Sequence, residues 1–128
     1  HAWLPDGMGI WMEKQSSFVF VVEMDRTRES SKNLSKKFLE YYLWEEWKTS
    51  ERIAGVVPDV LIVTTSWQRA ARVRTLFDAS RLRPAFEPLS LWMTTFDEME
   101  REGIAGAIWR HNADWGHVTR LPCFDLLS

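Results

Sequence analysis

The chain has 128 residues, of which 45% are hydrophobic and 27% are charged, a composition typical of one globular domain with its own core. Its formal net charge of −2 excludes a generally polybasic nucleic-acid-binding protein, and its single cysteine excludes an internal disulfide framework and fits a reducing, cytoplasmic compartment. No apolar run is long enough to span a membrane, so no membrane partner is expected.

The first part of the chain predicts a β-hairpin followed by a long helix. Pro5-Asp6-Gly7 is a turn signal, and residues 8–14 and 18–25 then have the composition of two antiparallel strands. Ser30 or Ser31 is a suitable N-cap for a helix that continues to about residue 48. This helix is apolar on two opposite sides. One side is expected to cover the sheet, and the other to meet a region upstream of the chain or a second subunit.

The remainder alternates strands and helices. Residues 59–65 form a continuous apolar, largely β-branched run of the kind found in buried parallel strands, and an arginine-rich helix is expected over 67–79. A strand over 88–95 and a short helix over 96–102 follow, with weaker extended signals at 106–109 and 118–121. The order β-β-α-β-α-β-α predicts an α/β domain spanning residues 1–128, with a mixed central sheet flanked by helices.

The second predicted strand ends in two carboxylates. Because side chains alternate along a strand, Glu23 and Asp25 share a face with Val21. Carboxylates are rarely buried in such apolar surroundings unless they are paired, hydrogen-bonded or bound to a metal. One interpretation is purely structural, with Arg26 or Arg28 pairing with the carboxylates at the rim of the sheet.

The other interpretation is a metal site. The hairpin brings Asp6, at the start of one strand, toward Glu23 and Asp25, at the end of the next. Three carboxylates at one edge are hard oxygen ligands, which suit Mg²⁺ or Mn²⁺. Such an ion can activate a water molecule and neutralise charge that develops on a phosphodiester, and a lysine beside it would assist.

Several motifs together resemble a known family. PDG is followed by FVFVVEMDRTRES, then by Lys37 with Tyr41, and then by DVLIVTTS with Arg69 and Arg72. This pattern resembles the replication-relaxation family of bacterial plasmids and mobile elements, and the later segments PLSLWMTTFDEM and GAIW agree more loosely. The layout is also similar to the PD-(D/E)xK nuclease superfamily, whose core has the order αβββαβ.

The resemblance implies a restriction-endonuclease-like fold that acts on DNA. Carried over to this chain, it makes Asp6 and Glu23 the metal ligands, with Asp25 assisting. The chain departs from the pattern because Asp25 stands where the superfamily has a lysine, two residues after the second acid. Some members recruit a basic residue from the following helix, which points to Lys37, and Arg26 is the other candidate. Lys37 could equally lay its stem on apolar surface with its ammonium group in water.

Arginines also cluster after the strand at residues 59–65. Arg69, Arg72 and Arg74, together with Arg26, could bind DNA phosphates, although a solvated helix face paired with local acids explains the cluster equally well. The spacing of His111, Asp114 and His117 could suit a transition metal, but a surface turn is the plainer interpretation.

Two functions therefore follow from the sequence. The first is a DNA-processing domain of a plasmid replication-relaxation-type protein that hydrolyses phosphodiesters with Mg²⁺ or Mn²⁺, and that forms the C-terminal part of a longer protein. The second is a nuclease-like fold that serves, without catalysis, as a DNA-binding or protein-interaction module.

Overall fold

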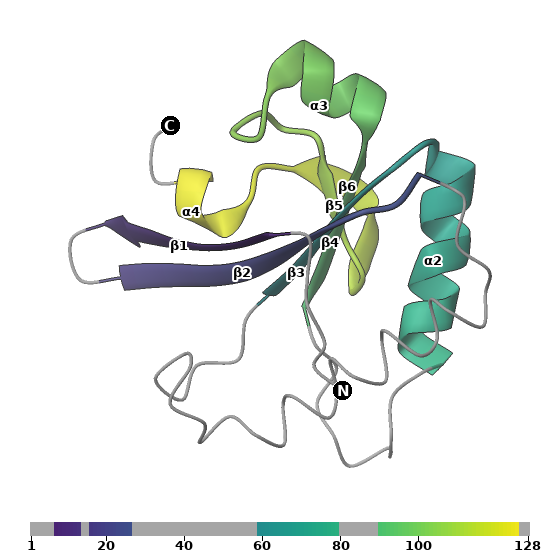
Figure 1. Cartoon of the computed structure of the whole chain (residues 1–128), viewed down its shortest axis with the longest axis horizontal. Coiled ribbons are helices and arrows are strands. Elements are labelled where there is room, and N and C mark those ends of the chain that lie inside the picture. The colour runs from purple at the N-terminus through teal and green to yellow at the C-terminus, as the bar shows by residue number, and fades with distance from the viewer. Residues whose placement is uncertain (1–6, 14–15, 27–58, 80–89, 126–128) are drawn as a thin grey trace.

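The computed structural model describes residues 7–13, 16–26, 59–79 and 90–125. Six strands form one sheet whose spatial order follows the order of the chain (Figure 1). The strands are β1 (Gly7–Glu13), β2 (Ser16–Met24), β3 (Asp59–Thr64), β4 (Leu91–Thr95), β5 (Trp109–His111) and β6 (Asp114–Thr119). The helices are α2 (Trp67–Ala79), α3 (Phe96–Glu102) and α4 (Pro122–Asp125).

The first two strands form the expected hairpin. β1 pairs antiparallel with β2, from Gly7 opposite Val22 to Glu13 opposite Ser16. This register sets the start of β1 beside the end of β2, which is the end that carries the carboxylates. The hairpin therefore has the polarity that the sequence predicts.

The three central strands are parallel. β3 lies between β2 and β4 and pairs parallel with both. Every residue from Val60 to Thr64 is buried, as expected for a strand whose two faces are both covered. The prediction of a buried parallel strand is confirmed.

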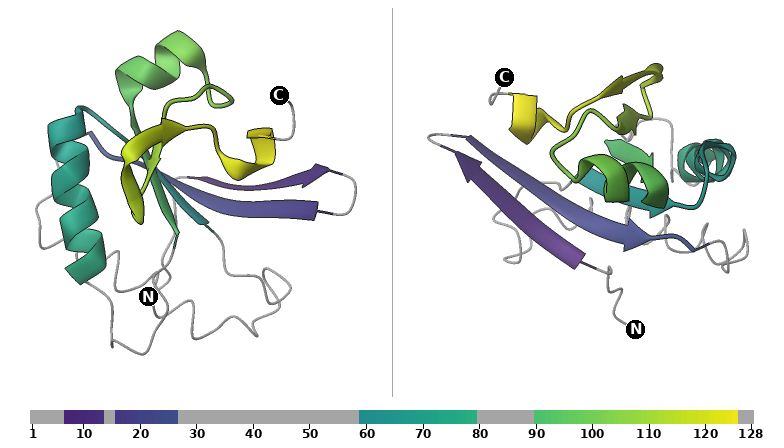
Figure 2. Two further views of the ribbon diagram at one scale, coloured as in Figure 1. Left: turned by 180° about the vertical axis from the view of Figure 1, so that it is seen from behind. Right: turned by 90° about the horizontal axis from the view of Figure 1, so that it is seen from above.

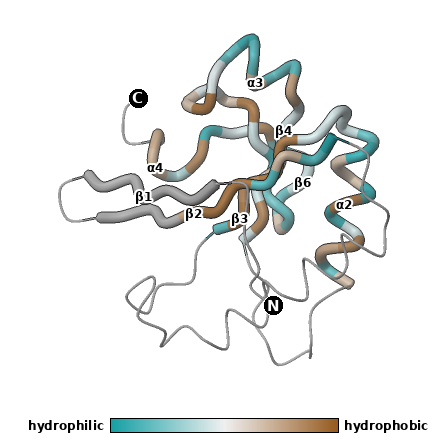
Figure 3. The backbone as a smooth tube through the Cα atoms, in the orientation of Figure 1, coloured by the Kyte–Doolittle hydropathy of each residue, from teal (hydrophilic) through white to brown (hydrophobic). Residues whose placement is uncertain are grey.

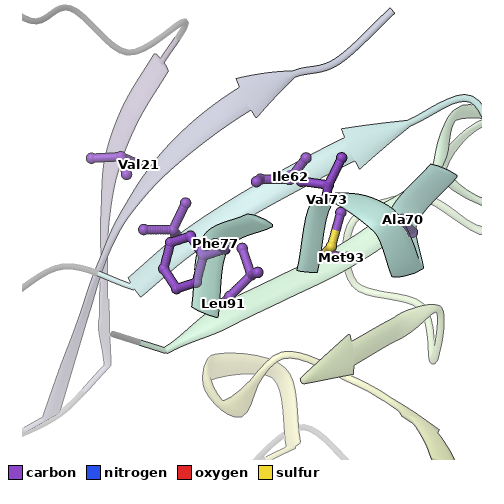
Figure 4. Close-up of a cluster of buried hydrophobic side chains, with 8 residues drawn as sticks. Val21, Ile62, Ala70, Val73, Phe77, Leu91 and Met93 are labelled. Atoms are coloured by element: carbon purple, nitrogen blue, oxygen red, sulfur yellow. The ribbon is translucent and has the colours of Figure 1, made fainter. Parts of the chain in front are cut away.

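One face of the sheet packs against α2. The helix buries Ala70, Val73 and Phe77 against the strands (Figure 4). Its period of 3.6 residues brings these three side chains to one side, while the alternation of the strands supplies the opposing surface. The strand residues in this cluster are Val21, Val60, Ile62, Leu91 and Met93.

The opposite face packs against the C-terminal half of the chain. Phe124 of α4 and the fully buried Trp109 join Leu61 and Val63, and Phe96 of α3 packs against this second cluster. In both views of Figure 2, α2 and α4 lie on opposite sides of the strands. Hydrophobic residues gather along β2 and β3, while α3 is largely hydrophilic (Figure 3).

α3 begins and ends at the residues that the sequence predicts. The hydroxyl oxygen of Thr95 accepts a hydrogen bond from the backbone N–H of Glu98, which caps the start of the helix. Gly103, at φ 76°, follows the last turn, and its N–H donates to the carbonyl oxygen of Met99. Only glycine adopts this backbone conformation without strain, so the helix stops there.

The end of the chain differs from the prediction. The extended segment expected at 106–109 begins only at Trp109, because the chain turns at Gly106, whose N–H donates to the carbonyl oxygen of Gly103 at 3.0 Å. The final strand begins at Asp114 rather than at residue 118, and forms an antiparallel hairpin with β5. β6 is exposed along most of its length, so it lacks the apolar alternation that would predict a strand.

The fold class is confirmed at its coarse level, as a mixed α/β sheet with helices. The described order adds a hairpin and a short helix, β5, β6 and α4, after α3. The helix expected from Ser30 to about residue 48 lies outside the described residues. None of the described helices is long and apolar enough to cross a membrane.

A polar contact joins the beginnings of β3 and β4. The indole Nε1–H of Trp92 donates a 2.8 Å hydrogen bond to a carboxylate oxygen of Asp59. Burial raises the pKa of Asp59, and the hydrogen bond from Trp92 partly opposes that rise. Asp59 therefore binds its proton more tightly in the folded chain than in the unfolded chain.

We predict that Asp59→Asn raises the free energy of unfolding at pH 7 and that this gain shrinks as the pH falls toward 4. The contribution of a carboxyl group with a raised pKa is fully present below its unfolded pKa and is lost as the pH rises through its folded pKa. The amide oxygen can still accept from Trp92 without the cost of a buried charge. Urea unfolding of both proteins between pH 4 and 7.5 measures the difference, and a deficit of equal size at every pH would contradict the prediction.

Candidate functional site

Polar side chains gather where the parallel strands end. β2 ends at Met24, β3 at Thr64 and β4 at Thr95. Because the three strands are parallel, these ends meet at one edge of the sheet. In open α/β sheets this edge is where ligands bind.

Glu23 and Asp25 share the α2 face of the sheet, as the alternation of β2 predicts. Glu23 pairs with Ile62, which belongs to the apolar cluster under α2. The backbone N–H of Asp25 donates a 2.8 Å hydrogen bond to the carbonyl oxygen of Val63, which continues the ladder by one residue beyond β2. Asp25 consequently lies beside Thr64.

Asp25 is held by a buried ion pair. Its side chain is 3% exposed and that of Arg69 is 12% exposed. The guanidinium Nε of Arg69 donates to Oδ2 of Asp25 at 2.9 Å, and a terminal nitrogen of Arg69 donates to Oδ1 at 3.4 Å. The hydroxyl of Thr64 donates to Oδ2 at 2.7 Å. Both oxygens of this carboxylate therefore accept hydrogen bonds from the protein.

This ion pair follows from the connection between β3 and α2. Ser66 caps the helix, with its hydroxyl oxygen accepting from the backbone N–H of Arg69 at 3.1 Å. The cap sets Arg69 in the first turn of α2, over the edge where Asp25 ends the ladder. The sequence-based hypothesis of a structural ion pair thus has a counterpart in the structure, in which Arg69 of α2 pairs with Asp25; Arg28 lies outside the described residues.

Glu23 is the second buried acid at this edge, two residues before Asp25 along the chain. It is 6% exposed, and its neighbour in the next strand, Ile62, is 2% exposed. A carboxylate in such surroundings is stable only when it is paired, hydrogen-bonded or bound to a cation. Glu23 therefore needs a partner at this edge, as Asp25 does.

The other predicted site residues are partly outside the described ranges. Asp6, Lys37 and Arg28 all lie outside them, so their roles stay predictions. Gly7, the residue after Asp6, pairs with Val22 and so adjoins Glu23 along β2. Within the described ranges, no three His, Cys, Asp or Glu side chains form a group that could hold a metal.

The donor set can be compared with the requirements of a hard cation. Glu23 offers a buried carboxylate at the correct edge, which fits Mg²⁺ or Mn²⁺. Asp25 fits poorly, since Arg69 and Thr64 already donate to both of its oxygens. The role of Asp6 and Glu23 as a metal ligand pair stays a prediction, because Asp6 lies outside the described residues.

The predicted DNA-binding arginines have different surroundings. The Arg26 guanidinium lies 4.7 Å from the ring centroid of Phe96. Arg72 is on an exposed position of α2, and Arg69 pairs with Asp25. Arg74 donates through Nε and a terminal nitrogen to the carbonyl oxygen of Asn112, at 3.1 and 2.7 Å. The arginines of α2 therefore do not form one uniform face.

The histidine motif is a surface hairpin, as its plainer interpretation predicts. Nδ1 of His117 lies 2.6 Å from a carboxylate oxygen of Asp114, and the resulting hydrogen bond raises the pKa of His117. Nδ1 of His111 accepts a hydrogen bond from the backbone N–H of Ala113. Burial lowers the pKa of His111, and the charge of Asp114 partly opposes this.

Comparison of the chain with protein-family models, with curated proteins and with solved structures gave no match. The residues and their geometry are therefore the basis for any function of this chain. Sequence reasoning missed Thr64 and the pairing of Arg69 with Asp25. The signal was partly present, because Thr64 ends the buried strand and Arg69 follows it in the first helical turn, but the strand register was needed to bring them to Asp25.

We predict opposite effects for two matched substitutions in adjacent strands. Thr64 and Thr94 are both fully buried. Thr64→Val removes a hydrogen bond to a carboxylate and should cost about 1.5–3 kcal/mol. Among the described residues the Thr94 hydroxyl has no hydrogen-bond partner, so Thr94→Val should be neutral or stabilising. Urea unfolding measures both, and an equal loss in the two variants would show that the Thr64–Asp25 contact contributes nothing specific.

Proposed function

We propose that this chain is a DNA-processing domain of the replication-relaxation type, with its reaction site at the carboxyl-terminal ends of β2 and β3. The observation that carries this proposal is that two acidic side chains, Glu23 and Asp25, are buried side by side on one face of this edge. Soluble proteins rarely retain such a pair without a ligand or a partner charge.

The arrangement of the strands supports the proposal. An antiparallel hairpin is followed by a strand that pairs parallel with its second member. This is compatible with the restriction-endonuclease-like core that the sequence resemblance implies.

In this function, Asp6 and Glu23 would hold Mg²⁺ or Mn²⁺. A bound divalent ion would supply a hydroxide nucleophile and neutralise charge on the phosphodiester. Asp25 would fix the guanidinium of Arg69 next to Glu23, bringing a cation to the site although position 25 itself is acidic. Lys37 would be the second basic group, as the resemblance suggests.

A second function is favoured by a specific observation. The nuclease pattern has a lysine at position 25. Here that position carries an aspartate whose two oxygens accept hydrogen bonds from Arg69 and Thr64. A domain that binds DNA or a protein partner without cutting would tolerate this replacement. We therefore propose the non-catalytic module as the alternative.

The test combines metal binding with plasmid nicking. Mg²⁺ and Mn²⁺ are titrated calorimetrically into the wild-type chain, Glu23→Gln and Glu100→Gln, and each protein is assayed on supercoiled plasmid. Glu100 is an exposed acid on α3 and serves as the matched control. Glu23→Gln should lose nicking by more than the roughly 10–100-fold that loss of an outer-shell partner of a metal costs.

The outcomes separate the two functions. Metal-dependent nicking that Glu23→Gln abolishes and Glu100→Gln retains would establish the hydrolytic site. DNA binding without nicking by any variant would favour the non-catalytic module. Thermal unfolding of all three proteins shows whether a loss of activity is a loss of fold.

A further inference from the structure

Two arginine and two tryptophan side chains are in contact between α2 and the β5–β6 hairpin. We call Trp67, Arg74, Arg110 and Trp115 the Arg–Trp strip. The guanidinium of Arg110 lies 4.5 Å from the ring centroid of Trp67, and that of Arg74 lies 5.0 Å from the ring centroid of Trp115. The two indole rings meet edge to face, with centroids 6.3 Å apart. All four side chains are partly exposed.

Within the described ranges, no acidic side chain pairs with the arginines of the strip. Elsewhere in the described structure, Arg69 pairs with Asp25 and Arg101 pairs with Glu98. Among the described residues, neither Arg74 nor Arg110 has a carboxylate partner. Arg74 donates to the neutral carbonyl of Asn112 instead. The strip is thus a local cationic region in a chain whose formal net charge is −2.

Arg110 is the less satisfied of the two arginines. Its Nε is buried and has no hydrogen-bond partner in the part of the chain that the structure describes. Buried polar atoms are nearly always hydrogen-bonded, and an exception calls for a bound water, ion or ligand. Stacking on Trp67 fixes the plane of the guanidinium, so little side-chain freedom remains to be lost when an anion binds.

The chemistry of the strip fits phosphate groups in a row. A guanidinium presents paired donors that match two oxygens of one phosphate. The two guanidinium groups lie against different indole rings of the strip, and we expect them to contact different phosphates of one strand. Trp67 also begins α2, two residues before the Arg69 that pairs with Asp25, so the strip starts beside the candidate site.

We propose that the Arg–Trp strip binds the phosphodiester backbone of DNA, with Arg110 as the principal contact and Arg74 as the second. The proposal deepens the proposed function and rests on it for the identity of the anion. The strip would hold the strand while the edge formed by β2 and β3 meets the phosphate to be cut. Arg110 and Arg74 carry no base-specific contact in this role, so binding should be insensitive to sequence.

The test is the salt dependence of DNA binding without metal. Fluorescence anisotropy in EDTA measures the affinity of the wild-type chain, Arg110→Gln, Arg74→Gln and Arg110→Lys for labelled duplex and single-stranded oligonucleotides between 50 and 200 mM salt. Arg101→Gln, which removes an exposed arginine on α3, is the matched control. Inorganic phosphate, added at constant ionic strength, shows whether an isolated phosphate competes.

Arg110→Gln and Arg74→Gln should each weaken binding by about tenfold and reduce the slope of log affinity against log salt by about one. Arg110→Lys should retain most of the slope, because its charge remains. Arg101→Gln should match the wild type. Competition by inorganic phosphate at concentrations far below those of the background salt would instead assign the strip to a free phosphate or nucleotide and overturn the DNA proposal.

The controls separate this proposal from the proposed function. If Arg110→Gln lowers the melting temperature but leaves affinity and salt slope unchanged, the strip is structural and the proposal is wrong, while the hydrolytic site is unaffected. If the strip variants weaken binding but the wild-type chain nicks no plasmid with either metal, the strip stands and the non-catalytic module is favoured. A wild-type chain that binds neither oligonucleotide overturns both the strip and the DNA function.

Discussion

The contact between Asp25 and Arg69 is the interaction on which the carboxyl-terminal edge depends. It joins the end of β2 to the first turn of α2, and Thr64 adds the end of β3 to the same carboxylate. Charges buried to this degree are costly to desolvate, and removing either partner leaves the other uncompensated. The pair therefore constrains how α2 meets the sheet. The position of α2 on the sheet in turn sets the positions of its buried apolar residues and of Trp67 at its start.

The buried residues of the parallel strands change from apolar to polar toward the carboxyl-terminal edge. In the middle of the parallel strands, valine, isoleucine and leucine fill both faces, and the packing there needs no polar partner. One or two residues further on, the strands carry acids and threonines that are almost as well buried. Burying polar groups at that edge lowers stability unless each one is satisfied. At Asp25 that requirement is met by Arg69 and Thr64, which donate to both of its carboxylate oxygens.

The arginines illustrate how little net charge says about local electrostatics. Arg69 neutralises an acid, Arg74 satisfies a backbone carbonyl, and Arg26 and Arg110 lie against aromatic rings. These roles differ although Arg69 and Arg74 lie on the same helix, α2. Helical geometry turns successive arginines of α2 toward different neighbours, so one meets β2 and another meets the β5–β6 hairpin. A cationic strip can thus exist on a chain whose overall charge is slightly negative.

The sequence by itself determined the hairpin, the parallel strand β3, the limits of α2 and α3, and the shared face of Glu23 and Asp25. These features depend on local periodicity, capping residues and turn signals, all of which lie within a few residues of one another. The sequence indicated a final strand only from residue 118 and missed the exposed first part of β6, which lacks apolar alternation, and it did not reveal that Arg69 would meet Asp25. Only the tertiary structure decided those points, because the partner of a buried charge is set by strand register and helix placement across 44 positions of separation. The same holds for the stacking of Arg110 on Trp67.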